Sequence, residues 1–226
     1  MVLPYILLVL FVIALAVYCS RSRRKPFSYE LISKMSCSAL FVLTALALRA
    51  EFPRGDSLWF TMMLAALLLS FLGDLFLVLR RHPAFKKNAF FLVGGLCFLL
   101  THCCLCALYM IRAGFHPLSL LMTAAIVLFA VFMTRRVKLS FRSYKYLALI
   151  YSIVISFMLC CSVFLLQGGV VPLALCTVLG SLLFLISDCF LAFHYFSHTA
   201  REWIGTANAI TYFCGQMLLA WSIAFV

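Results

Sequence analysis

The chain has 226 residues, of which 66% are hydrophobic and 11% charged, and its mean hydropathy is +1.16. A soluble domain needs a polar surface and cannot reach these values, so the composition excludes a soluble enzyme and indicates a multi-pass membrane protein. The formal net charge of +12 would suggest a nucleic-acid partner in a soluble protein. In a membrane protein it is expected to set the topology instead, and no nucleic acid is expected.

Apolar stretches of roughly 17 to 25 residues, long enough to cross a bilayer as helices, follow one another along the chain. They predict an all-α fold, a polytopic membrane bundle of eight transmembrane helices. The predicted helices span residues 2–19, 31–48, 58–79, 89–111, 117–133, 146–166, 172–193 and 204–226. No stretch is left for a soluble domain, so residues 1–226 are expected to form a single integral membrane domain in the lipid bilayer.

Basic residues gather in the loops that follow the first, third and fifth predicted helices. They are Arg21, Arg23, Arg24, Lys25, Arg80, Arg81, Lys86, Lys87, Arg135, Arg136, Lys138, Arg142 and Lys145. The opposite loops contain only Arg49, Arg54 and Arg112. The positive-inside rule then places both termini on the non-cytoplasmic side of the membrane. In a bacterial source this would be the cytoplasmic membrane. Because the first basic cluster follows its apolar stretch, the first helix is expected to be an uncleaved anchor, not a signal peptide.

Two of the six acidic residues lie inside apolar stretches, Asp74 in the third predicted helix and Asp188 in the seventh. An ionisable group at bilayer depth costs free energy and usually serves transport, catalysis or a fixed partner. One carboxyl of such a pair can stay a protonated acid while the other acts as a base, so both aspartates are candidate catalytic residues. The alternative is a structural role, in which each aspartate caps backbone groups or pairs with Lys34.

The two aspartates are 114 residues apart, close to half of the chain, and the same offset carries His102 onto Gln216. This spacing suggests a duplication into two parallel four-helix repeats, residues 1–113 and 114–226. In that arrangement both carboxyls lie at similar depth, roughly 9 Å from the cytoplasmic ends of their helices.

Other polar side chains recur at helical spacing, and in lipid such stripes turn toward the interior of the bundle. Those near the aspartates are candidates for binding or orienting a substrate: Lys34, Ser70, Ser187, Tyr212 and Gln216. Lys34 can equally extend to the cytoplasmic surface. His102 is a further catalytic candidate as a proton relay, against the alternative of a hydrogen-bonded core histidine.

Metal-binding patterns are weak in this sequence. His194 and His198 have a spacing that suits two ligands, but polar residues at a helix end explain them as well. Cys103 and Cys106 form one C-x-x-C without a second pair, and most of the eleven cysteines fall within predicted helices as packing residues. No metal and no cofactor is therefore expected.

Four predicted helices carry motifs in a fixed order along the chain. They are S-x-x-G-D ending at Asp74, G-x-x-F-x-x-x-H ending at His102, G-S-L-L-F-x-x-S-D ending at Asp188 and T-Y-F-x-x-Q ending at Gln216. With these motifs, and with Lys34 near the start of the second helix, the chain resembles the lysoplasmalogenase-like YhhN family of membrane proteins. One departure is Leu105, which replaces a tyrosine that often follows the histidine in that family.

The resemblance implies a membrane hydrolase that cleaves the vinyl ether bond of a lysoplasmalogen, releasing a fatty aldehyde and the glycerophospho-headgroup. The expected substrate is a lysophospholipid or ether lysolipid. Protonation of a vinyl ether needs a desolvated acid and a carboxylate near the resulting cation, roles that Asp74 and Asp188 would divide. Lys34 or a loop arginine would hold the phosphate.

Two other function classes stay open. A transporter or lipid carrier also uses buried carboxyls at matching depth, and helices broken at the aspartates would favour it. A metal-dependent lipid hydrolase would need more buried histidines than His102 alone.

Overall fold

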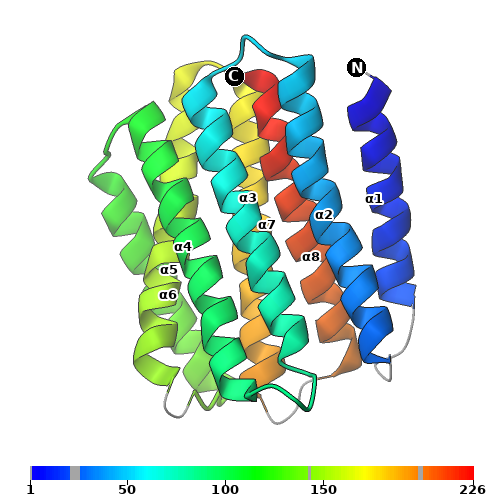
Figure 1. Cartoon of the computed structure of the whole chain (residues 1–226). Coiled ribbons are helices and arrows are strands. Elements are labelled where there is room, and N and C mark those ends of the chain that lie inside the picture. Colours follow the sequence, from blue (N-terminus) through cyan, green and yellow to red (C-terminus); the bar gives the residue numbers. More distant parts are fainter. Residues whose placement is uncertain (1, 21–25, 142–143, 198–200) are drawn as a thin grey trace.

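The computed structural model describes residues 2–20, 26–141, 144–197 and 201–226, and every regular element in these ranges is a helix (Figure 1). The long helices are α1 (Val2–Ser20), α2 (Phe27–Glu51), α3 (Ser57–Leu79), α4 (Lys87–Ala113), α5 (Leu118–Arg136), α6 (Lys145–Val163), α7 (Val171–Phe196) and α8 (Glu202–Trp221). Two short 3-10 turns, η2 (Phe164–Gly168) and η3 (Ser222–Phe225), extend α6 and α8. The predicted all-α bundle of eight helices is confirmed.

Local chemistry explains several helix ends. Asp56 caps the start of α3, where its carboxylate accepts hydrogen bonds from the backbone N–H groups of Leu58 at 2.8 Å and Trp59 at 3.2 Å. Gly114 ends α4 with a φ of +80°, a conformation that glycine adopts at little cost. These caps fix where the chain turns between the apolar stretches.

Within the described residues, α1 to α7 are long and apolar enough to cross a membrane by length and composition. Helix α8 is not among these candidate spans, although it lies inside the bundle and packs against α1, α2, α3 and α7. Its buried residues include Phe213 and Gln216, both with an exposed fraction of 0%. Because protein rather than lipid surrounds this face of α8, its polar residues are compatible with the depth of the bundle.

Glycines let two helix pairs pack closely. A Cβ at Gly94 of α4 would lie 3.2 Å from the carbonyl oxygen of Gly73 in α3, and a Cβ at Gly215 of α8 would lie 3.0 Å from that of Gly180 in α7. Small residues at such crossings allow backbones to approach, as is common in membrane bundles. The pairs α3–α4 and α7–α8 therefore form the tight centre of the fold.

The two outer helices differ in how they join this centre. Helix α1 packs against both α2 and α8, whereas α5 packs against α6 alone (Figure 1). Among the residues of α5, only Ser119 and Thr123 are buried. Helix α5 therefore stands away from α4 and α7.

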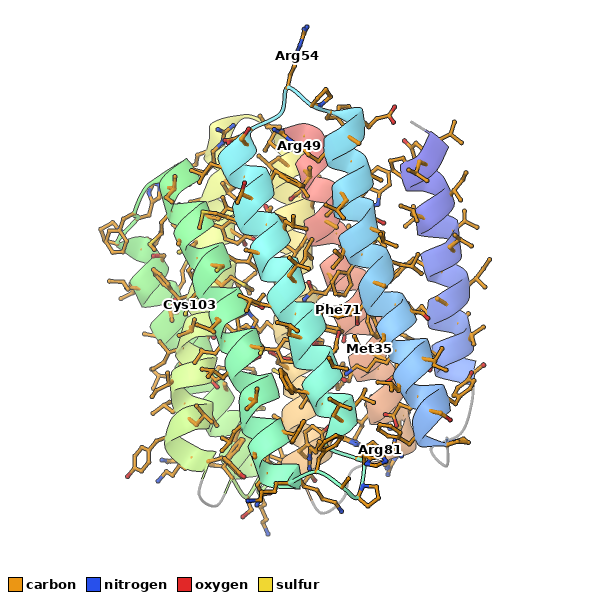
Figure 2. The ribbon with its side chains drawn as sticks, viewed as in Figure 1. Met35, Arg49, Arg54, Phe71, Arg81 and Cys103 are labelled. Carbon is orange, nitrogen blue, oxygen red and sulfur yellow. The ribbon has the colours of Figure 1, made fainter. Side chains whose placement is uncertain are left out.

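The start of α1 and the end of the chain lie at the same end of the bundle (Figure 1). Arg49 and Arg54 lie at that end, and Arg81 lies at the opposite one (Figure 2). Six residues singled out from the sequence lie outside the described residues: the basic Arg21, Arg23, Arg24, Lys25 and Arg142, and the candidate metal ligand His198. The side of the membrane that each end faces stays a prediction.

The offset of 114 residues also relates the helix bounds. It moves the first residue of α3, Ser57, to position 171, where α7 begins, and the first residue of α4, Lys87, to position 201, next to the start of α8 at Glu202. The same offset pairs α2 with α6 and α4 with α8. The contacts agree with this pairing, because α4 packs against α6 and α8 packs against α2. These bounds support the duplication, which stays a prediction.

Candidate active site in two polar clusters

Asp74 is the centre of a sealed group on α2, α3 and α8, named here the Asp74 cluster (Lys34, Ser38, Asp74 and Tyr212). Lys34 Nζ lies 2.9 Å from Asp74 Oδ1, while the hydroxyls of Ser38 and Tyr212 donate to Oδ2 at 2.7 and 2.8 Å. Asp74 is only 1% exposed. The carboxylate thus has a cation on one oxygen and two hydrogen-bond donors on the other, which balances its buried charge.

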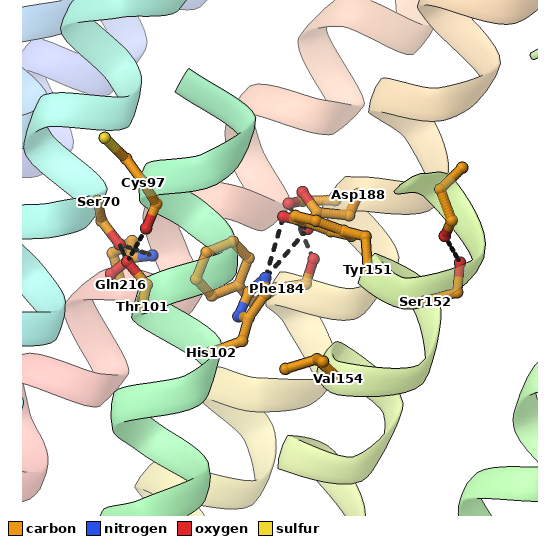
Figure 3. A network of polar contacts seen from close by, with 12 residues as sticks. Ser70, Cys97, Thr101, His102, Tyr151, Ser152, Val154, Phe184, Asp188 and Gln216 are labelled. Atoms are coloured by element: carbon orange, nitrogen blue, oxygen red, sulfur yellow. Dashed lines mark hydrogen bonds and ion pairs between the residues drawn. The ribbon is translucent and has the colours of Figure 1, made fainter. Parts of the chain in front are cut away.

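A chain of polar groups continues from this cluster into the bundle. The Ser70 hydroxyl lies 3.3 Å from that of Thr101 and accepts a hydrogen bond from Gln216 Nε2 at 3.2 Å (Figure 3). The other amide atom, Gln216 Oε1, is buried and has no hydrogen-bond partner among the described residues. Buried polar atoms of this kind usually bond to an ordered water or a ligand.

A second group, the Asp188 cluster (His102, Tyr151 and Asp188), joins α4, α6 and α7. The Tyr151 hydroxyl donates to Asp188 Oδ2 at 2.6 Å, and His102 Nε2 lies 3.0 Å from the same hydroxyl (Figure 3). Because the Tyr151 hydroxyl donates its hydrogen bond to Asp188, its oxygen accepts one from the N–H group at His102 Nε2. His102 Nδ1 is buried and has no hydrogen-bond partner in the described part of the chain.

Two aromatic rings, Phe98 and Phe184, lie between the two clusters. Phe98 and Phe184 contact each other and the ring of Tyr212, with centroid distances of 6.1, 5.7 and 5.4 Å, and Phe184 lies 4.5 Å from the His102 ring. Within the described residues, no hydrogen bond joins Asp74 to Asp188. From the sequence, both aspartates were expected to share one catalytic site. In the structure each carboxyl has its own set of partners.

The Asp188 cluster reaches a cavity. A space of about 530 Å³ lies between α4, α5, α6 and α7, and Asp188 and Tyr151 are in its wall together with Phe98 and Gly95. The rest of the wall is mainly apolar, and Asp74 and Lys34 are not part of it. The cavity exists because α5 stands away from α4 and α7. Its size is within the usual range for ligand pockets, roughly 300 to 1,000 Å³.

The remaining predicted site residues take other positions. The Ser187 hydroxyl donates to the Phe184 carbonyl of its own helix at 3.0 Å, and its carbonyl accepts a hydrogen bond from Asn208 at 2.7 Å. Ser187 therefore joins α7 to α8 instead of reaching either carboxyl. No group of three metal-ligating side chains occurs among the described residues, and none of the eleven cysteines forms a disulfide there.

Sequence reasoning missed two members of the clusters, Ser38 and Tyr151. Ser38 follows Lys34 by four residues and so shares its helical face, a signal that was present in the sequence. Tyr151 is one of two phenols in the predicted helix 146–166, with Tyr146, and only the packing of α6 against α4 and α7 shows its role. It supplies His102 with a phenol from another helix, where the tyrosine expected on α4 is replaced by Leu105.

Comparison with known proteins agrees with this description. No curated protein and no solved structure matches the chain. The family model of the YhhN family matches residues 29–223, which include both polar clusters and the cavity. The chain therefore belongs to the YhhN family.

Proposed function

We propose that the protein is a membrane hydrolase that cleaves the vinyl ether bond of a lysoplasmalogen, with Asp188 as the proton donor. The observation that carries this proposal is the position of Asp188 in the wall of an apolar cavity, bonded to Tyr151 and, through it, to His102. The YhhN family is associated with lysoplasmalogenase-like activity, which supports the reaction class.

The reaction begins with a protonated Asp188. Its Oδ1 has no hydrogen-bond partner among the described residues, so this oxygen is free to give a proton to the outer carbon of the vinyl ether. The oxocarbenium ion that forms adds one water at the carbon next to the ether oxygen. The proton released by that water returns to Asp188, and the resulting hemiacetal separates into the fatty aldehyde and the glycerophospho-headgroup.

Tyr151 and His102 position the acid. After proton transfer the carboxylate of Asp188 keeps the hydrogen bond from Tyr151, which stabilises its charge while the cation exists. His102 in turn donates to the oxygen of Tyr151 and holds the phenol in this orientation. The unpaired atom Nδ1 of His102 is available to a water molecule in the interior of the bundle.

Asp74 has a different role in this proposal. Its two oxygens already hold Lys34, Ser38 and Tyr212, and it lies outside the cavity wall. Because Lys34 neutralises this carboxylate, Asp74 acts by holding Tyr212, whose ring packs against Phe98 in the cavity wall, without touching the substrate. Asp74 is therefore proposed as a positioning residue, with Ser70 and Gln216 as its support.

A lipid carrier is the competing function. Carriers of this kind bind their cargo at interrupted helices. Here α3 runs unbroken from Ser57 to Leu79 through Asp74, and α7 runs unbroken from Val171 to Phe196 through Asp188. Continuous helices at both aspartates favour the enzyme.

The test is aldehyde release from a lysoplasmalogen by the full chain in detergent, with a saturated alkyl-ether lysolipid as the control substrate. Wild type is expected to act on the vinyl ether alone, and Asp188→Asn is expected to abolish this activity. Asp74→Asn should lower it and leave a measurable rate. Full activity of a folded Asp188→Asn variant would refute the assignment, and no aldehyde from folded wild type would refute the hydrolase.

A further inference from the structure

Arg80, the residue that follows α3, packs against two aromatic rings. Its guanidinium carbon is 4.3 Å from the ring centroid of Tyr195 in α7 and 4.9 Å from that of Phe91 in α4. The two rings also contact each other edge to face at 5.4 Å. Contacts on two rings hold the plane of a guanidinium while its N–H groups remain available at the edges.

Arg80 has no anionic partner among the residues that the structure describes. The next residue, Arg81, behaves differently, because it forms an ion pair with Glu30 of α2. Two neighbouring arginines at the same end of the bundle thus differ in their surroundings: Arg80 is half-buried on two rings without a carboxylate, whereas Arg81 is exposed and paired with one. A half-buried, oriented and uncompensated guanidinium is suited to bind an anion through paired hydrogen bonds.

The rings that hold Arg80 also belong to the cavity. Phe91 and Tyr195 both line the space that Asp188 and Tyr151 reach. Tyr195 follows Asp188 by seven residues on α7, which is roughly 10 Å along the helix axis. Arg80 therefore marks the polar end of an apolar cavity, and the offset leaves room for a glycerol backbone between an anion at Arg80 and a reacting bond at Asp188.

We infer that Arg80 binds the headgroup phosphate of a single-chain phospholipid whose hydrocarbon chain lies in the cavity between α4, α5, α6 and α7. The inference deepens the proposed function and rests on the cavity being its substrate site. Lys34, the other candidate for this role, is already paired with Asp74 and is not in the cavity wall. A chain in the apolar wall and a phosphate at Arg80 together match both ends of one amphipathic ligand.

The experiment measures binding rather than turnover. The probe is a saturated alkyl-ether lysophosphoethanolamine, which has the phosphate and the chain but no vinyl ether, added to the full chain in a nonionic detergent. Wild type is compared with Arg80→Gln and with the matched control Arg81→Gln. Arg80→Gln is expected to raise Kd about tenfold or more, because a charge-assisted contact is lost. Arg81→Gln should change Kd by no more than about twofold, since an exposed pair contributes little.

Two further ligands identify what Arg80 recognises. An alkylglycerol of the same chain, which lacks phosphate, is expected to bind wild type and Arg80→Gln equally. Glycerol phosphate, which lacks the chain, is expected not to displace the probe. Equal Kd for the probe in wild type and Arg80→Gln, an equal loss in Arg81→Gln, or displacement by glycerol phosphate alone would each overturn the inference.

Arg80→Lys is a second variant, which keeps the test valid if Arg80→Gln does not fold. It keeps the charge and loses the planar fork, so its Kd for the probe is expected to lie between those of wild type and Arg80→Gln. The result of this binding experiment can be distinguished from the result of the aldehyde-release test of the proposed hydrolase. Binding that depends on Arg80 without aldehyde release would retain the phosphate site and refute the reaction, and hydrolysis with an unchanged KM in Arg80→Gln would do the reverse.

Discussion

Lys34 and Asp74 form an ion pair of 2.9 Å between α2 and α3, with side-chain exposures of 14% and 2%. Such a pair costs desolvation that its attraction only partly offsets, so it contributes less to stability than to fixing one arrangement of the helices. Ser38 and Tyr212 complete the coordination of the carboxylate from α2 and α8. The Asp74 cluster therefore joins three helices around one charge.

Removing the lysine alone should destabilise the protein strongly. Lys34→Met leaves the Asp74 carboxylate buried without its cation, and the expected cost is about 3–5 kcal/mol. Lys34→Met combined with Asp74→Asn should recover much of this loss, because no unpaired charge is then buried. Thermal unfolding in detergent of the two single variants and the double variant measures the coupling. Additive effects of the two changes would contradict a functional ion pair.

Tyr151→Phe should separate catalysis from folding. The ring stays in place while the hydroxyl that links His102 to Asp188 is lost, so we expect aldehyde release to fall about a hundredfold to ten-thousandfold. The unfolding temperature should change little. Tyr146→Phe is the control, since Tyr146 is on the same helix and is 76% exposed. Activity of Tyr151→Phe close to wild type would exclude the proposed positioning role of the phenol.

Adjacent glycines of α4 should respond in opposite ways. A Cβ at Gly94 would meet the Gly73 carbonyl and the Leu77 side chain at 3.2 Å, whereas a Cβ at Gly95 would meet no atom within 4 Å. Gly94→Ala is expected to destabilise the protein by about 1–3 kcal/mol through overpacking. Gly95→Ala should be neutral, or stabilising by up to about 1 kcal/mol, because alanine restricts the unfolded chain. Thermal unfolding of the two variants in one detergent compares them, and equal shifts would argue against the close approach of α3 and α4.

Filling the cavity should block substrate without disturbing the polar clusters. Ala130 of α5 is in the cavity wall, so Ala130→Trp is expected to raise KM or abolish aldehyde release. Ala124→Trp places the same ring on α5 at an exposed position outside that wall and should leave activity unchanged. Steady-state kinetics of both variants decides the matter. Equal activity of the two would show that the cavity is not the substrate site.

Residue patterns predicted the helices well for a simple reason. A helix that crosses lipid must be apolar over a nearly fixed length, so a run of consecutive apolar residues is enough to locate it. The predicted span 58–79 agrees with α3 at Ser57–Leu79, and the predicted span 172–193 agrees with α7 at Val171–Phe196 apart from its last turn. The predicted span 204–226, another apolar stretch, likewise covers α8 at Glu202–Trp221 and the turn η3 that follows it.

Contacts between side chains of different helices could be predicted from the sequence only in part. Lys34 was named as a partner that Asp74 could have, but the same residue could equally have extended to the surface. Tyr151 gave no signal, because a phenol in an apolar stretch looks the same whether it faces lipid or a carboxyl. Its bond to Asp188 depends on α6 packing against α7, a contact between segments that no periodicity encodes.

The sequence by itself determined the helical bundle, the positions of Asp74 and Asp188 within their helices, and the polar stripes that turn inward, because each follows from local hydrophobicity and helical period. The tertiary structure decided which aspartate is sealed and which meets a cavity. Helix α1 packs against α2 and α8, on the side of Asp74, while α5 packs against α6 alone and leaves a space beside Asp188. This difference arises from contacts between helices distant in sequence, whose energies depend on shape rather than on local pattern.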